Sequence, residues 1–245
     1  VGEDATVSAT SVNIDAESTE IATSRNTSVA FGLGAAIDIS LANANINSVT
    51  EAFAGTRDGE TPQGSGTSIT ATQGDITIDA SGERDADAKT LGLSASADVA
   101  VAAAAPTAEI GGRIQAGASG ATTLSASDDI DISADGSNDA VADALVASIS
   151  FGVSGSGAKA TARILDTADI EAVVGSGVSM SGDAITVDAA HTSITADEAA
   201  LDAISVDIFA PAVEPEFNRA KAQARGGAGG ILGAGTIMLS EATVA

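Results

Sequence analysis

A strict alternation of apolar and small residues runs from residue 29 to residue 41, and it constrains the fold more than any other feature. Its even positions are Ala, Gly, Asp or Ser. Its odd positions are all apolar: Val29, Phe31, Leu33, Ala35, Ile37, Ile39 and Leu41. A period of two places these side chains on one face of an extended chain, whereas a helix would scatter them around its axis. The alternation therefore predicts β-structure.

This apolar stripe recurs along the chain. A second copy spans residues 91–103, a third spans 145–153, and a weaker fourth spans 204–212. A stripe of 13 residues is about twice the usual strand length of ~5–6 residues. Either the strands are unusually long or the run turns a corner, and the pattern leaves both interpretations open.

Two sets of short alternating strands give the length of the repeat. The first set is anchored at Val7, Ile69, Leu124, Met180 and Leu239, which lie 62, 55, 56 and 59 residues apart. The second set is anchored at Ile14, Ile78, Ile132 and Val187, which lie 64, 54 and 55 residues apart. The longer first interval contains a Gly-rich polar insertion at 56–66. Two independent anchors with one period indicate an internal repeat.

The apolar residues occupy odd positions within the stripe but even positions before and after it. In the second copy, Ala86 and Ala88 are even, whereas Leu91 and Leu93 are odd. A slip of one residue turns every side chain of a strand to the opposite face. We therefore expect a bulge or a turn near residues 89–90.

Residues 215–225 fit two descriptions. Pro215 and Glu216 would suit the first turn of a helix, which Gly226 would end. Against this, the sequence AKAQAR at 220–225 aligns with AKATAR at 158–163 in the preceding repeat. We favour a strand.

A unit of ~55 residues cannot bury its apolar face alone, but stacked copies share one core. We therefore predict an all-β fold, a parallel β-helix (β-solenoid) built from about four ~55-residue repeats. An array of β-sandwiches fits less well, because such domains need ~100 residues and aromatic cores, whereas this chain has no Trp, no Tyr and five Phe. We expect one continuous solenoid over 1–245, with repeats at about 1–55, 67–117, 118–175 and 176–230 and a partial fifth at 231–245. The number of coils per repeat stays open.

The charge excludes several partners. The chain has 34 acidic residues against 10 basic ones, a net charge of −24. Nucleic acid and anionic membrane surfaces both require clustered Lys and Arg. The longest apolar run, 99–105, is far shorter than the ~20 residues of a membrane-spanning helix. We expect no nucleic acid and no membrane insertion. The repeat pattern is cut at both ends, so we expect a window from a longer protein.

The sequence from Ala108 to Ala134 resembles the repeats of a known protein family. The phrase AEIGG, then SGATTLSASDDIDISA, then an Ala–Val alternation is similar to the repeats of filamentous-haemagglutinin-like giant bacterial adhesins. The similarity lies in the order and spacing of residue types rather than in an invariant motif, and it extends over all four repeats. It implies a secreted, rod-like, right-handed β-solenoid that projects from a bacterial cell surface, and it carries over no functional residue.

The candidate metal ligands are acidic. Carboxylate oxygens suit Ca²⁺, and the candidates are Asp128, Asp129, Asp131, Asp135 and Asp139. EF-hand spacing is absent, so solvated turns are the preferred interpretation of these residues. Asp15, Asp79 and Asp188 occupy equivalent places in three repeats; because a whole repeat separates them, we expect each to face water without contact. No other cofactor is indicated.

The sequence offers no catalytic constellation. His191 is the only histidine and there is no cysteine, so neither a transition-metal site nor a recognisable triad is present. We expect no enzyme. The Thr-rich strand at 67–72 raises an ice-binding interpretation, but Val7-Ser8 and Met180-Ser181 interrupt the row.

Two classes of function remain. The first is a structural shaft segment of a secreted bacterial surface adhesin, which supplies reach and rigidity and whose partners are flanking repeats of the same chain. The second is a self-assembling subunit of an extracellular filament, in which open strand edges of separate copies pair end to end. A Ca²⁺- or ice-binding repeat module is a further alternative. The receptor is not indicated.

Overall fold

The computed structural model describes residues 1–57, 60–61, 64–191 and 218–244. The described chain is all-β, and its strands form three parallel sheets. This confirms the predicted parallel β-solenoid. No helix of the described part is long and apolar enough to cross a membrane.

One repeat is one coil, and each coil contributes a short strand to sheet A and long strands to sheets B and C. The first two coils consist of β1 (Thr6–Ala9), β2 (Val12–Gly32) and β3 (Ala35–Gly55), then β4 (Thr67–Ala71), β5 (Ile76–Ser96) and β6 (Val99–Ser119). The third consists of β7 (Thr122–Ala126), β8 (Ile130–Ser150), β9 (Val153–Ile164) and β10 (Asp169–Val174). The fourth consists of β11 (Ser179–Ser181), β12 (Ile185–His191), β13 (Asn218–Gly230) and β14 (Gly233–Val244).

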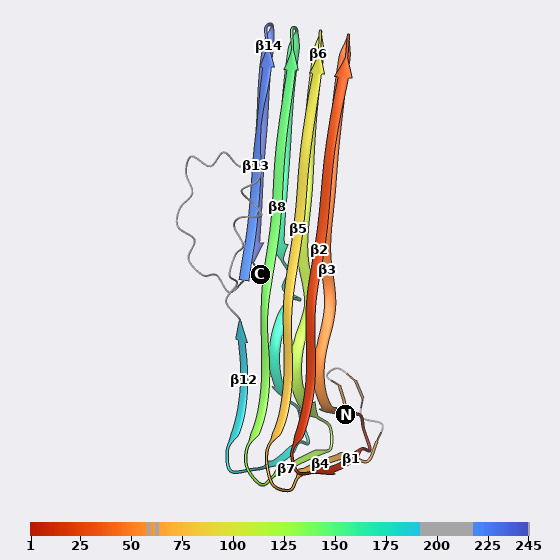
Figure 1. The fold of residues 1–245 in the computed structure, drawn as a ribbon, viewed down its shortest axis with the longest axis vertical. Helices are drawn as coiled ribbons and strands as arrows, with labels where there is room; N and C mark the ends of the chain where they lie inside the picture. Colours follow the sequence, from red (N-terminus) through yellow and green to blue (C-terminus); the bar gives the residue numbers. More distant parts are fainter. Residues whose placement is uncertain (58–59, 62–63, 192–217, 245) are drawn as a thin grey trace.

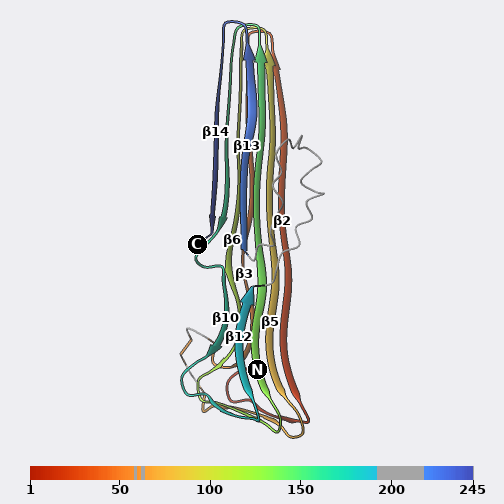
Figure 2. The same cartoon turned by 90° about the vertical axis from the view of Figure 1, so that its left-hand side faces the viewer.

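The molecule is a blade whose long axis follows the strands. Figure 1 shows β2, β5, β8 and β13 side by side along this axis, with β1, β4 and β7 crossing the base. A strand of 21 residues spans ~70 Å, whereas four coils stacked ~4.8 Å apart measure only ~19 Å. The second view shows the long strands of sheets B and C joined by tight turns at the end opposite the base (Figure 2). We call that end the tip.

The register confirms both sets of anchors, with the exception of Leu239. Ile14 pairs with Ile78, Ile78 with Ile132, and Val187 with Ile132, so each anchor lies one coil from the next. In sheet A, Val7 pairs with Ile69 and Ile69 with Leu124. The long apolar stripe of the sequence is explained by both interpretations together: the strands are long, and the run turns at the tip between β2 and β3.

The end of the chain does not begin a fifth coil. We expected a partial repeat at 231–245, anchored at Leu239. Residues 233–244 instead form β14, which pairs with β9 in sheet C and completes the fourth coil. The weaker fourth stripe at 204–212 lies outside the described residues.

The expected bulge near residues 89–90 is absent. Lys89 and Thr90 pair in register with both neighbouring strands, and even positions face inward along the whole of β5 and β6. The parity change therefore does not reverse the strand. It reverses the chemistry of the two faces, so that beyond Lys89 the apolar residues face outward.

The strand over 220–225 is confirmed, but its alignment with 158–163 is wrong. Residues 220–225 lie in β13, where Ala220 pairs with Ala140 of sheet B. Residues 158–163 lie in β9 of sheet C. The two Ala-Lys-Ala runs match because both sheets need Ala at inward positions of this level of the blade.

The core changes along the long axis. At the base, where three sheets enclose a wider space, it is rich in Ile and Leu: Ile69, Ile76, Ile78, Ile114, Leu124, Ile130 and Ile132. Above it, where only sheets B and C face each other, the core is mostly Ala: Ala42, Ala44, Ala86, Ala88, Ala102, Ala104, Ala108, Ala140, Ala142, Ala144, Ala158, Ala160 and Ala162. Small side chains permit the close approach of the two sheets.

Truncation of the base core should destabilise the fold. Ile78 is fully buried, so Ile78→Ala should lower the free energy of unfolding by about 2–5 kcal/mol, because it removes buried methyl groups and leaves a cavity. Urea denaturation followed by circular dichroism measures the change. The matched control is Ile21→Ala, since Ile21 is 69% exposed on the outer face of β2; its effect should stay within about 0.5 kcal/mol. Equal effects of the two changes would contradict the assigned core.

Candidate functional site

An acidic row crosses the outer face of sheet B near the base. Asp15 pairs with Asp79, Asp79 with Ser133, and Ser133 with Asp188. The expectation that these residues make no contact is wrong, because one repeat is one coil and equivalent residues are neighbours. Ser133 Oγ donates a hydrogen bond to Asp79 Oδ1 at 2.6 Å. Ser133 thus lies between Asp79 and Asp188 and interrupts the row of carboxylates across the sheet.

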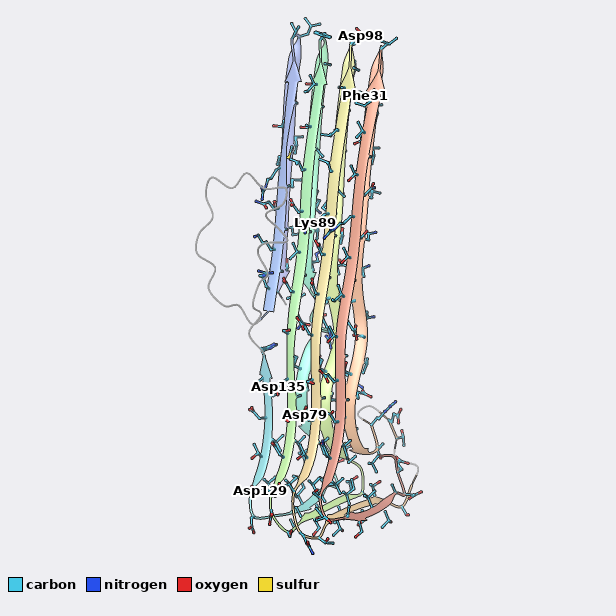
Figure 3. The ribbon with its side chains drawn as sticks, in the orientation of Figure 1. Phe31, Asp79, Lys89, Asp98, Asp129 and Asp135 are labelled. Carbon is cyan, nitrogen blue, oxygen red and sulfur yellow. The ribbon has the colours of Figure 1, made fainter. Side chains whose placement is uncertain are left out.

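Asp135 lies beside this row on the same face (Figure 3). Partial burial raises the pKa of its carboxyl above the ordinary value of 3.8, and the neighbouring charges of Asp79, Asp188 and Asp131 raise it further. The charges therefore repel one another in the folded state. Higher on the same sheet, burial likewise raises the pKa of Asp85 and of Asp143.

Asp129 has a structural role in the turn between β7 and β8. Its backbone N–H donates to Asp75 Oδ1 of the preceding coil at 3.0 Å, and its own Oδ1 accepts the backbone N–H of Ala184 in the next coil at 3.0 Å. The corresponding turns of the second, third and fourth coils are therefore joined by Asp side chains. This series of hydrogen bonds occupies Asp129 Oδ1, an oxygen that a cation would require.

The five calcium candidates do not converge. Asp128 and Asp129 lie in the turn before β8, Asp131 and Asp135 lie on the outer face of β8, and Asp139 pairs with the guanidinium of Arg219, whose Nε lies 2.8 Å from Asp139 Oδ1. No three His, Asp or Glu side chains of the described chain are grouped to hold a metal ion. His191 is exposed at the end of β12.

Arg84 is a fully buried cation that the motif analysis missed. It points inward between sheets B and C, and its Nη1 donates to the carbonyl oxygens of Gly111 and Gly112 at 3.3 Å each. Burial lowers the pKa of its guanidinium, while Glu20 and Asp169 act in the opposite direction. The side chain is closed to solvent at the junction of the two cores, and its Nε and Nη2 have no hydrogen-bond partner among the described residues.

The apolar stripes form the outer faces of the blade at its tip. We define the tip segment as residues 26–41, 90–105, 144–158 and 226–239. Its outward aliphatic and aromatic side chains are strongly exposed: Phe31 is 81%, Leu33 91%, Ile39 68%, Phe151 74% and Leu232 80% exposed. The only charged residues in the tip segment are Asp38, which is buried, and Asp98, at the turn. A contiguous apolar surface of this kind marks an interaction site.

The interior of the tip segment mixes buried Ala with small hydroxyl residues. The Oγ atoms of these inward serines have no hydrogen-bond partner among the described residues: Ser28, Ser40, Ser94, Ser148, Ser154 and Ser156. A buried polar atom without a partner costs about 1–3 kcal/mol. The tip segment thus differs from the base: its interior holds unpartnered hydroxyls beside Ala, and its large apolar side chains face outward.

Ion pairs mark the border between the tip segment and the acidic part of the blade. On sheet B, Lys89 Nζ lies 2.9 Å and Arg25 Nη2 lies 3.7 Å from Asp87 Oδ2. On sheet C, Arg163 Nη2 lies 2.6 Å from Glu241 Oε1. Figure 3 shows Lys89 at this border and Phe31 above it, toward the tip.

The stack is open beside the first coil. A cavity of about 530 Å³ lies there, lined by Glu3, Ile14, Asp15, Glu51 and Phe53 among others. Arg57 and Arg113 both pair with Glu51. The cavity therefore belongs to the exposed end of the solenoid interior rather than to an enclosed ligand site.

Comparisons with known proteins give no assignment. No protein family model matches the chain, and neither a curated protein nor a solved structure is similar to it.

Acidification should stabilise this protein through its crowded carboxyls. Because the folded-state pKa of Asp135 is raised, the folded state binds its proton more tightly than the unfolded state, and stability falls as pH rises above 3.8. Asp135→Asn should therefore raise the melting temperature at pH 7, and its advantage should shrink as pH falls toward 4. Thermal unfolding by circular dichroism at pH 7, 5.5 and 4 measures this.

The matched control is Asp4→Asn, for which the sign is opposite. Hydrogen bonds from Ser65, including Ser65 Oγ at 2.9 Å, lower the pKa of Asp4, so its contribution is present at neutral pH and lost as pH falls. Asp4→Asn should give no gain at pH 7. A lower melting temperature for Asp135→Asn at pH 7 would contradict the repulsion inferred on sheet B.

Proposed function

We propose that this chain is a structural module: a stack of broad coils that forms a stiff ribbon within a secreted bacterial surface protein. The observation that supports this is the uninterrupted parallel register of the long strands. β2, β5 and β8 are each 21 residues long and pair over their whole length, from Val12 with Ile76 to Gly32 with Ser96.

The pairing gives the ribbon its stiffness. Every coil is joined to its neighbours by ladders in three sheets, so bending along the stack would break many backbone hydrogen bonds together. Side-chain ladders such as the Asp75–Asp129–Ala184 turn series reinforce the same direction. The resemblance to giant adhesin repeats supports a location on the bacterial cell surface.

The dimensions of a coil favour a broad, rigid stack over one that extends far from its point of attachment. One coil advances the stack by ~4.8 Å and uses 55 residues between Thr67 and Thr122, whereas solenoid repeats as short as ~20 residues are common. A chain selected for reach would use short coils. Long coils instead produce two wide, flat faces.

End-to-end assembly of separate copies is the second candidate. β2 and β3 form the edges of sheets B and C at the first coil, and each edge presents 21 residues without proline or bulge. Long, flat edges template further strands. The partners are then flanking coils of the same chain or other copies.

Insertion of one coil tests the structural role. A second copy of residues 67–121, placed directly after residue 121, should add a coil in register because Thr67 pairs with Thr122. We expect one cooperative unfolding transition, a denaturant m-value larger by about a fifth because it scales with the surface exposed on unfolding, and a blade ~4.8 Å thicker by small-angle X-ray scattering.

The control is an insertion of the same 55 residues in scrambled order, which should add a loop and leave the m-value nearly unchanged. A natural insert that behaves like the scrambled one, or that unfolds in a separate transition, would overturn the proposal. Growth of filaments with rising concentration of the unmodified chain would favour the end-to-end candidate.

A further inference from the structure

We infer that the outer face of sheet C is a lateral interface at which a second copy of this chain packs face to face. The inference goes beyond the proposed structural role, because that role concerns stacking along the coil axis and this interface lies perpendicular to it. Its first support is the amount of exposed hydrocarbon at the tip. The exposed side chains of this face are Ile37, Ile39, Leu41, Val99, Val101, Val153, Ile237 and Leu239, each 38–69% exposed.

The relief of this face is self-complementary. At one end of the stack, Ile37, Ile39 and Leu41 of β3 form a ridge. Two coils away, the residues level with Ile37 and Ile39 are Gly155 and Gly157 of β9, where an added Cβ would meet nothing closer than 3.8 Å, and Lys159 is level with Leu41. The glycines therefore leave a shallow groove that matches Ile37 and Ile39 in level and direction.

A two-fold axis parallel to the strands brings ridge and groove together. Such an axis through β6 places β3 of one copy over β9 of the other, and the reverse, as an isologous interface requires. Val101 then lies near its own symmetry mate. Because the strands of both copies run in the same direction, the contact continues toward the base, where Asn43 and Asn45 lie over Thr161 and Arg163 of the other copy and Glu109 lies near its own symmetry mate.

The distribution of charge favours the outer face of sheet C over that of sheet B as the lateral interface. Below the tip segment, the outer face of sheet B carries the acidic side chains Asp15, Asp79, Asp85, Asp87, Asp131, Asp135, Asp139, Asp143 and Asp188. Two of these pair with a base, Asp87 with Lys89 and Asp139 with Arg219, whereas on sheet C Glu51, Glu109 and Glu241 each pair with an arginine. Packing through sheet C leaves both acidic faces in solvent, where their mutual repulsion is smallest.

The area is sufficient for a dimer. About the axis through β6, the strands β3, β6 and β9 of the two copies overlap, and seven residues per strand give a flat area of ~330 Å² per copy at the tip. The levels down to Asn47 add six residues per strand, so two copies bury ~1,200 Å² in total, above the ~1,000 Å² at which specific interfaces begin.

A second copy fits this face better than a lipid bilayer. A bilayer interior requires partners for every backbone group, whereas β2 and β3 leave open edges. Membrane interfaces favour Trp and Tyr, and the chain has neither. The net charge of −24 also opposes approach to anionic lipid.

Sedimentation equilibrium of the whole chain tests the interface. We expect a dimer at micromolar concentration, and Ile39→Asp and Val101→Asp should each raise the dissociation constant at least tenfold. The matched control is Phe31→Asp, at the tip but on sheet B and 81% exposed, which should leave the dimer intact. A monomeric parent chain, or dissociation by Phe31→Asp but not by Ile39→Asp, overturns the inference.

Cysteine cross-linking tests the orientation, since the chain has no cysteine of its own. A mixture of Ile39→Cys and Gly157→Cys should form a disulfide-linked heterodimer under mild oxidation, and neither variant alone should cross-link. Self-linkage of Ile39→Cys alone would overturn the ridge-to-groove geometry. Flotation of a monomeric parent chain with phosphatidylcholine–phosphatidylglycerol vesicles would overturn the inference in favour of lipid.

Failure of this interface is separable from failure of the proposed function. The coil insertion reports on the stack and is measured within one chain. Sedimentation and cross-linking report on lateral association. A monomer that accepts the extra coil would remove the lateral interface and leave the structural role supported.

Discussion

The parallel backbone ladder between coils is the interaction on which the rest of this structure depends. It holds 21-residue strands in strict register, and strict register fixes which residues face inward. Because parity never changes within the long strands, the chain cannot move its apolar side chains from one face to the other. It changes the amino acids instead, from apolar inside at the base to apolar outside at the tip.

The fold was predictable because its evidence is periodic. The two-residue alternation of apolar and small residues predicted strands. Two sets of anchors, such as Ile14 and Ile78, predicted the length of the repeat, which the register confirms. The prediction of a bulge at residues 89–90 was wrong because it assumed that apolar side chains face inward along the whole strand. Periodicity gives the face on which residues lie, but it does not say whether that face is buried. The partial fifth repeat at Leu239 was wrong for a related reason, since a short alternating run fits sheet A and sheet C equally well.

The candidate sites were less predictable because they depend on the size of a coil. Asp15 and Asp79 are 64 residues apart in sequence and neighbours in space, and no spacing rule connects them until one repeat is known to be one coil. Arg84 was within reach: it occupies an even position among Ile78, Ala80, Ala86 and Ala88, so parity alone would have placed its guanidinium inside. The outward orientation of the apolar residues in the tip segment could be recognised only from the structure.

The change of interior along each strand has a consequence for how the blade opens. Near the base, buried Ile and Leu side chains from three sheets pack together, whereas at the tip buried serine hydroxyls have no hydrogen-bond partner among the described residues. Amide hydrogen exchange should therefore be graded within single strands, fastest near Ser94 and slowest near Ile78. One continuous β-strand would then contain both the first and the last part of the protein to admit water.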